Sequence, residues 1–144
     1  MNTLKFISCS AILFIFTQVN AQDRYLQSNE YPEKIVSFVK THFPEDQIIS
    51  IEEEKERRKV EYEVKLNSRT ELEFDGKFSV KKIESKTGLP DSVLPEKIVK
   101  YVAENYPGRK IEEWKKKRRY QEIELDNSLE LEFDFDGNFM KIDD

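Results

Sequence analysis

Apolar residues along the chain follow two kinds of spacing, and each kind occurs twice. The first is the spacing of one helical face, with apolar residues at Ile35, Val36, Val39 and Phe43. The second is strict alternation of apolar and charged residues from residue 60 to residue 66, typical of a strand with one buried face and one solvent-facing face. A second helical pattern follows Pro95, and alternation resumes at Ile123. The sequence therefore predicts a helix and strands, and then a helix and strands again.

This repetition extends to identical residues. PEKIVSFVKTHFP begins at Pro32 and PEKIVKYVAENYP begins at Pro95, an offset of 63 positions. Further along, LEFDGKF at residues 72–78 matches FDFDGNF at residues 133–139, an offset of 61. We therefore expect the second copy to have lost two residues between its helix and its final hairpin.

Turn-forming residues separate the predicted strands, at Asn67-Ser68, Asp75-Gly76, Asp126-Asn127-Ser128 and Asp136-Gly137. Each copy thus predicts one helix followed by about four antiparallel strands, with Ser28 and Asp91 as the helix N-caps. The predicted fold class is α+β: two tandem repeats, residues 22–86 and 87–144, with helices packed on an antiparallel sheet. Because about sixty residues make a marginal domain alone, we expect the repeats to share a core or a continuous sheet in one compact domain.

The N-terminal residues have the pattern of a secretion signal. Lys5 precedes an uncharged apolar run at residues 6–16, and small or modest side chains lead up to Ala21. We expect residues 1–21 to be a signal peptide cleaved after Ala21, with an uncleaved anchor as the alternative. Cys9 lies inside the apolar run rather than at its end, which disfavours a lipoprotein. The predicted location is the periplasm or outside the cell, without stable membrane insertion after cleavage.

Composition excludes several functional classes. The residues after Ala21 carry 23 basic and 29 acidic side chains, which argues against a nucleic-acid binder. They contain no cysteine, so we expect no disulfide and no thiol enzyme. His42 is the only histidine and suits the C-terminal end of the first helix better than a metal site. No glycine-rich phosphate loop or nucleophile elbow is present. We therefore predict a protein that is not an enzyme and has no cofactor.

The order of these features resembles the PepSY-like family of small exported proteins, common in the Bacteroidetes. The helix is followed by YPG at residues 106–108 and then by EFDFDGNF at residues 132–139, and the resemblance covers residues 28–142. Such proteins are also described as having a fold like that of beta-lactamase-inhibitory protein. The resemblance implies a tandem α+β fold and a role in binding or inhibiting other proteins, with no catalytic residues. This chain differs from the inhibitor in lacking disulfides and in a solvent-facing sheet surface rich in Glu and Lys.

Two basic runs are the main candidate site. The first contains Lys55, Arg57, Arg58 and Lys59, and the second contains Lys115, Lys116, Lys117, Arg118 and Arg119. Each run follows glutamates and falls near the expected turn between the first two strands of its copy. The runs predict an anion-binding edge for lipopolysaccharide phosphates, an acidic glycan or an acidic partner. The alternative is two solvated hairpin ends balanced by neighbouring carboxylates.

Two further features have open interpretations. Trp114 is the only tryptophan and aligns with Ile51, which predicts a core or sheet-edge position, with a ligand-facing platform as the alternative. The stretch DFDGN at residues 134–138 predicts a tight turn between strands. Its alternative is a weak calcium site formed by the acidic residues Asp134, Asp136, Asp143 and Asp144.

The prediction for function combines these observations. We expect an exported, non-enzymatic binding or inhibitor-type module with an envelope or secreted protein as its partner and no affinity for nucleic acid. The alternative is a periplasmic sensor or carrier of an anionic ligand or a calcium ion.

Overall fold

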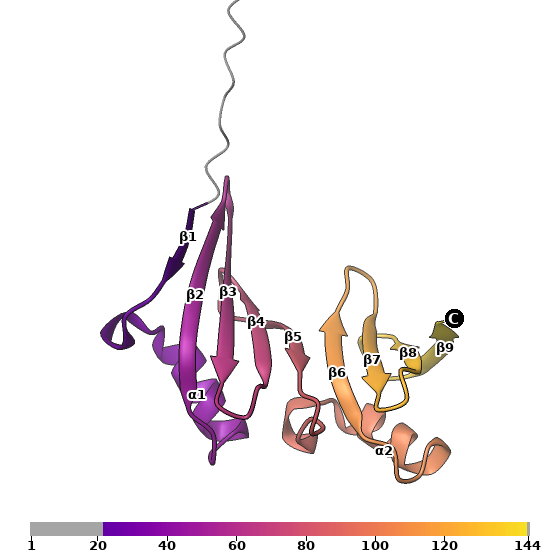
Figure 1. Ribbon diagram of the computed structural model, residues 1–144. Helices are drawn as coiled ribbons and strands as arrows, with labels where there is room; N and C mark the ends of the chain where they lie inside the picture. The colour runs from indigo at the N-terminus through magenta and orange to yellow at the C-terminus, as the bar shows by residue number, and fades with distance from the viewer. Residues whose placement is uncertain (1–21, 144) are drawn as a thin grey trace, which may run out of the picture.

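One antiparallel sheet of nine strands, arranged in chain order, forms the framework of the protein in a computed structural model that describes residues 22–143 (Figure 1). The strands are β1 (Gln22–Tyr25), β2 (Ile48–Glu56), β3 (Lys59–Leu66), β4 (Glu71–Asp75), β5 (Val80–Glu84), β6 (Ile111–Lys116), β7 (Gln121–Leu125), β8 (Glu130–Phe133) and β9 (Phe139–Asp143). The helices are α1 (Glu33–His42) and α2 (Glu96–Asn105). The predicted signal peptide, residues 1–21, and Asp144 lie outside the described residues.

The structure corrects the predicted fold class, because the sheet does not divide into two helix-plus-strand repeats. β5 and β6 pair across the predicted boundary through three register pairs: Lys82 with Lys115, Ile83 with Trp114, and Glu84 with Glu113. β1, which sequence patterns did not predict, pairs with β2 ahead of α1. A unit that ended at β5 would expose a row of unpaired N–H and C=O groups, and pairing with β6 satisfies them. The description as two α+β repeats is therefore wrong, and the fold is a single sheet with two short helices of 10 residues each.

The helix starts also differ from expectation. Pro32 and Pro95 are the N-cap residues of α1 and α2, in extended conformation with φ of −60° and −57°. Ser28 and Asp91, the predicted caps, instead begin short 3-10 turns, η1 (Ser28–Glu30) and η2 (Asp91–Val93). A proline lacks the N–H group that would be unpaired at a helix start, and its fixed φ favours the first turn. In the described part of the chain, no helix is long and apolar enough to cross a membrane.

The apolar core lies on the helix-facing side of the sheet. One row of register partners crosses six strands there: Val64, Leu72, Ile83, Trp114, Ile123 and Leu131. The buried residues of α1, Ile35 and Val39, belong to one hydrophobic cluster, and those of α2, Ile98 and Val102, belong to a second. Half-buried side chains contact both clusters and join them: Leu89, Val93 and Trp114. Trp114 therefore contributes to the seam of the core.

The opposite face of the sheet is charged. A second row of register partners crosses it from β2 to β9: Glu52, Glu63, Glu73, Lys82, Lys115, Glu122, Glu132 and Lys141. We call this surface the polar face. Its carboxylates outnumber its lysines, and the central lysines are held between glutamates. Lys82 Nζ, for example, lies 2.9 Å from Glu84 Oε2 and 3.0 Å from Glu113 Oε2.

Candidate functional site

The two basic runs meet at one end of the sheet. The β2–β3 turn at residues 57–58 and the β6–β7 turn at residues 117–120 both lie at the upper end of Figure 1. Between them, β5 and β6 pair only as far as Lys82 and Lys115, so the strands separate beyond these residues. The separation leaves a hollow of about 660 Å³, here called the basic notch. Its cationic lining residues are Arg58, Lys59, Lys77, Lys81, Lys116, Lys117 and Arg118.

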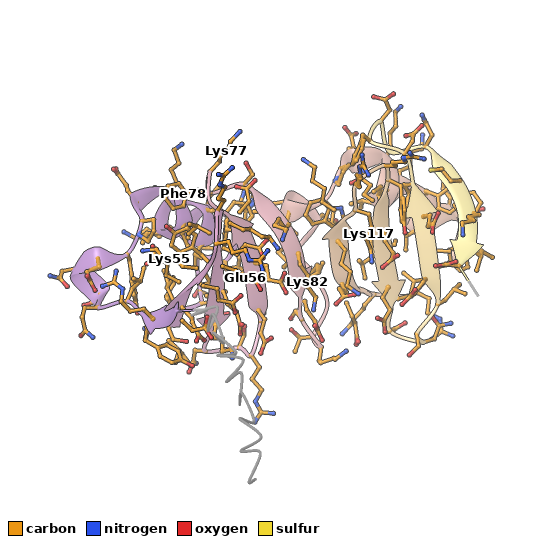
Figure 2. The ribbon with its side chains drawn as sticks, turned by 90° about the horizontal axis from the view of Figure 1, so that it is seen from above. Lys55, Glu56, Lys77, Phe78, Lys82 and Lys117 are labelled. Atoms are coloured by element: carbon orange, nitrogen blue, oxygen red, sulfur yellow. The ribbon has the colours of Figure 1, made fainter. Side chains whose placement is uncertain are left out.

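Three hairpins supply these cations. Figure 2 looks down on this end of the sheet and labels Lys77 of the β4–β5 turn, Lys82 of β5 and Lys117 of the β6–β7 turn. Lys77 and Lys81 were not predicted as site residues. The available signal was the Asp75-Gly76 turn, which is directly followed by a lysine; its place beside the other two turns depends on strand pairing.

Carboxylates neutralise only part of the positive charge of the basic notch. Lys59 Nζ lies 2.7 Å from Glu61 Oε2, and Lys81 contacts the other oxygen of the same carboxylate. Lys117 Nζ lies 3.2 Å from Glu122 Oε1. Within residues 22–143, four lining cations make no ion pair with a carboxylate: Arg58, Lys77, Lys116 and Arg118. The notch therefore has a local excess of positive charge.

The environment of Lys81 reflects its burial and, to a smaller extent, this excess of positive charge. Burial, followed by repulsion from Lys59, lowers the pKa of the Lys81 ammonium group, although Glu61 lies against it. A lowered lysine pKa means that the charged form is disfavoured in its present surroundings. An additional anion in the notch would relieve this effect, because it would offset the repulsion between the two lysines.

The predicted binding residues separate into four groups. Those that line the notch are Arg58, Lys59, Lys116, Lys117 and Arg118. Arg57 and Arg119 are exposed on the same two turns, and Arg57 has a left-handed φ of 52°. Lys115 points onto the polar face, where it contacts Glu113 and lies 3.8 Å from Glu122 Oε1. Trp114 lies on the helix-facing side and takes no part in the notch.

Trp114 is held by a hydrogen-bonded chain. Its Nε1–H donates to Gln121 Oε1 at 2.9 Å, and Gln121 Nε2 donates to the carbonyl oxygen of Asp134 at 2.8 Å. One edge of the indole borders a hollow of about 370 Å³ together with Pro95 and Phe135. The ring is half-buried and contacts both hydrophobic clusters, in accord with the core interpretation.

The DFDGN stretch forms a turn organised by Asp134. Asp134 Oδ1 accepts hydrogen bonds from the backbone N–H groups of Asp136 and Asn138 at 2.9 Å and 2.8 Å, and Asn138 Nδ2 donates to Oδ2 at 2.8 Å. The Asn138 side chain and then its backbone N–H lower the pKa of the Asp134 carboxyl. Gly137 takes the positive φ, 80°. The carboxylate of Asp134 is therefore occupied in shaping the hairpin.

The matching turn in the first half shows that the sequence alignment was two residues out. Asp75 Oδ1 accepts from the N–H groups of Lys77 and Ser79, as Asp134 does from Asp136 and Asn138, so the structural offset here is 59 rather than 61. Because the two helices are offset by 63 positions, the second copy lacks four residues between its helix and its final hairpin, and not two. Phe78, with φ of 64°, occupies the left-handed position rather than Gly76. The feature that the two turns share is therefore the aspartate and not the position of the glycine.

A different acidic cluster lies on the polar face. Carboxylate oxygens of Glu122, Glu132 and Asp143 lie within 4.8 Å of one another. Lys141 Nζ is 3.3 Å from Glu132 Oε1 and 3.0 Å from Asp143 Oδ1, and Lys117 approaches Glu122. Lysine ammonium groups thus already neutralise much of this cluster.

Solved structures with the same architecture include proteins that are described as periplasmic. A protein of unknown function from Bacteroides vulgatus is 31% identical, with a TM-score of 0.79 over 85% of this chain and 100% of the other. A Bacteroides thetaiotaomicron protein described as a "putative calcium-regulated periplasmic protein" is 29% identical, with a TM-score of 0.78 over 85% and 97%. A second periplasmic protein from Bacteroides vulgatus is 32% identical, with a TM-score of 0.77 over 85% and 97%. Among curated proteins, none matches the chain.

The family match agrees with the resemblance seen in the sequence. The family described as "Putative beta-lactamase-inhibitor-like, PepSY-like" matches twice, at residues 15–82 and 61–141, which accords with the internal repetition of the sequence. It is an inhibitor-like family and not a known enzyme family. The residues matched span most of the polypeptide, and the chain belongs to the PepSY-like family.

Proposed function

We propose that this protein is a non-enzymatic binding module of the periplasm, which captures an acidic segment of an envelope protein in its basic notch. The observation that carries the proposal is the convergence of two basic runs, about sixty residues apart in the chain, on one hollow with several cations that have no carboxylate partner among the described residues. The relatives described as periplasmic support the proposed location, and the inhibitor-like family supports a role in binding rather than in catalysis.

The width of the notch favours a protein segment over a single small anion. β3 and β6 are three strand spacings apart, or about 14 Å at about 4.8 Å for each spacing. One phosphate group has too few oxygens and too little charge to pair with all seven cations that line the notch. An extended segment advances about 3.3 Å for each residue, so acidic side chains four residues apart would reach both rims. The central lysines, Lys77 and Lys81, would face the residues between them.

The test compares capture of envelope proteins by two charge-matched variants. The double substitution Lys77→Gln/Arg118→Gln removes two notch cations, and Lys40→Gln/Lys100→Gln removes two exposed lysines from the helices. We expect a partner that the wild-type protein and the helix variant retain equally. The notch variant should bind this partner about tenfold more weakly, since each exposed charge contact contributes up to about 1 kcal/mol.

Salt provides the second readout. Binding through exposed cations should weaken steeply between 50 and 500 mM NaCl, because ions screen charges beyond about 10 Å at 0.1 M and about 3 Å at 1 M. The notch variant should show a shallower dependence than the wild-type protein. Equal retention of the same partner by the notch and helix variants would refute the notch as the binding surface.

The acidic cluster on the polar face supports a second candidate function, a response to calcium. Its three carboxylates, Glu122, Glu132 and Asp143, lie within coordinating reach of one another, and one structural relative is described as calcium-regulated. Calcium would have to displace Lys141 from Glu132 and Asp143. The test is the thermal midpoint in 2 mM calcium and in chelator, for the wild-type protein and for Glu132→Gln. A calcium-dependent rise that Glu132→Gln abolishes would support this candidate, and equal midpoints would exclude it.

A further inference from the structure

A second hollow lies at the opposite end of the sheet from the basic notch, between the two helices. It has a volume of about 760 Å³, within the range of small-molecule sites, and we call it the inter-helix cleft. α1 contributes its last residue, His42, and α2 contributes Val99, Val102 and Ala103. The residues that follow each helix, the β3–β4 turn and the segment between β5 and α2 complete the lining. No residue of the basic notch borders it.

The two helices differ at a position where α2 borders the cleft. At the helix offset of 63, Val99 matches Val36 and the small Ala103 matches Lys40. A lysine at position 103 would place a long charged side chain beside the cleft, whereas alanine leaves space there. On the opposite wall, Leu89 and Pro90 add apolar surface. The cleft is also braced, because His42 Nδ1 lies 3.1 Å from Ser92 Oγ and so links α1 to the turn before α2.

The floor of the cleft carries four hydroxyl groups in a hydrogen-bonded chain. Ser68 Oγ lies 2.8 Å from Thr70 Oγ1, Thr70 donates to Ser85 Oγ at 3.1 Å, and Ser85 Oγ lies 3.0 Å from Thr87 Oγ1. Thr70 and Ser85 are each 2% exposed, while Ser68 and Thr87 at the ends are exposed. Polar groups buried to this degree require partners, and these two satisfy each other.

The number of hydroxyl hydrogens shows that one of the four has no acceptor within this chain of hydroxyl groups. Each hydroxyl has a single hydrogen, and four hydroxyls share three bonds. Because Thr70 gives its hydrogen to Ser85, Ser68 must donate to Thr70. Ser85 then donates to Thr87, since otherwise its own buried hydrogen would be unsatisfied. The free hydrogen is therefore that of Thr87, at the border of the cleft.

The charged residues that line the cleft are of both signs, and two of them, Asp46 and Arg109, are engaged within the protein. Asp46 Oδ1 accepts hydrogen bonds from the N–H groups of Gln47 and Ser68 at 2.9 Å and 3.1 Å. Arg109 Nη1 lies 3.5 Å from Asp126 Oδ1. We infer that the inter-helix cleft binds an uncharged small molecule, with an apolar body between the helices and a hydrogen-bond acceptor directed at Thr87.

The test uses the fluorescence of N-phenyl-1-naphthylamine, an uncharged apolar probe, with the purified protein. We expect saturable binding of one probe molecule, displaced by 2-nonanone at concentrations at least tenfold below those needed for nonanoate or nonylammonium. Ala103→Trp fills the cleft and should weaken probe binding at least tenfold. Val99→Phe fills it from one helical turn away and should act in the same direction. Lys40→Trp, the matched position on α1, should bind the probe like the wild-type protein.

Thr87→Val tests the hydrogen bond to the acceptor of the ligand separately from the contacts of its apolar body. It should weaken 2-nonanone by about three- to tenfold and leave probe binding unchanged, as expected for one hydrogen bond of about 1 kcal/mol. Absence of saturable binding, or unchanged binding by both Ala103→Trp and Val99→Phe, would overturn the inference. Equal displacement by the ketone and by the charged nonyl compounds would also overturn it. The notch variant Lys77→Gln/Arg118→Gln should retain the probe, so the two proposals fail independently.

Discussion

Lys82 is placed to test whether the charged polar face stabilises the sheet. Its ammonium group bridges β5 and β6, at 2.9 Å from Glu84 Oε2 and 3.0 Å from Glu113 Oε2, with side-chain exposures of 25%, 30% and 9% for the three residues. Burial alone would lower the pKa of Lys82, but the two glutamates outweigh it and raise that pKa. The cation is therefore stabilised by the two strands that it joins.

Lys82→Met should reduce the free energy of unfolding by about 2–3 kcal/mol at pH 7. Each hydrogen bond to a charged group contributes about 1.5–3 kcal/mol, and partial exposure reduces the sum of two. The substitution also leaves Glu84 and Glu113 directly opposite each other, which adds about 0.2–1 kcal/mol of repulsion. The control is Lys86→Met. Lys86 also reaches two glutamates, at 3.5 Å each, but its side chain is 71% exposed, so we expect a loss below about 0.5 kcal/mol.

Urea unfolding at pH 7 and pH 3 measures both effects. The hydrogen bond from Lys82 lowers the folded-state pKa of Glu84. Its contribution is therefore present above the unfolded pKa of about 4.3 and is lost as pH falls through the lowered folded value. The difference between Lys82→Met and the wild-type protein should shrink below about 1 kcal/mol at pH 3. A difference under 0.5 kcal/mol at pH 7, or one that does not change with pH, would refute the reasoning.

Two further predictions concern backbone strain and core packing. Gly137→Ala should destabilise the protein by about 2 kcal/mol and Gly108→Ala by about 1, because both glycines have positive φ but only a Cβ at 137 would meet Lys97 Cβ, at 3.0 Å; equal urea midpoints for the two would contradict this. Phe133→Ala, at a fully buried position, should cost about 3–5 kcal/mol, whereas Phe135→Ala, at a position 51% exposed, should cost less than about 1; similar thermal midpoints for the two would show that burial does not decide the outcome.

The local periodicities predicted part of the core correctly. The helical pattern placed Ile35 and Val39 toward the sheet, and both are buried. The strand alternation placed Tyr62, Val64 and Leu66 on one face, and all three are buried as well. These predictions succeed because a side chain's direction follows from the backbone period alone. β1 was missed because its four residues, QDRY, contain no alternating apolar positions.

Features that depend on contacts between distant segments could not be predicted from the spacing of residues along the chain. Nothing local to Ile83 or Trp114 indicates that their strands pair, so residue spacing predicted two repeats and left open whether they share a core or a continuous sheet. The same limit applies to the site. The basic runs were visible as charge patterns, but the notch also needs Lys77 and Lys81, which join it only once β4 and β5 lie between the other two hairpins. The inter-helix cleft, built from five separate segments, left no pattern in the sequence at all.

The charge distribution of the sheet bears on how an acidic partner would find the notch. The protein has a net charge of −5, and the row that begins Glu52, Glu63 and Glu73 makes much of the polar face negative. An acidic segment is repelled by such a surface and attracted by the few positions where cations are in excess. Because the β2–β3 and β6–β7 turns lie at one end of the sheet, attraction and repulsion would together direct the segment to that end. The acidic face would then contribute to specificity without touching the partner, so a variant that neutralises Glu52 and Glu63 should bind acidic segments less selectively, although every cation of the notch remains in place.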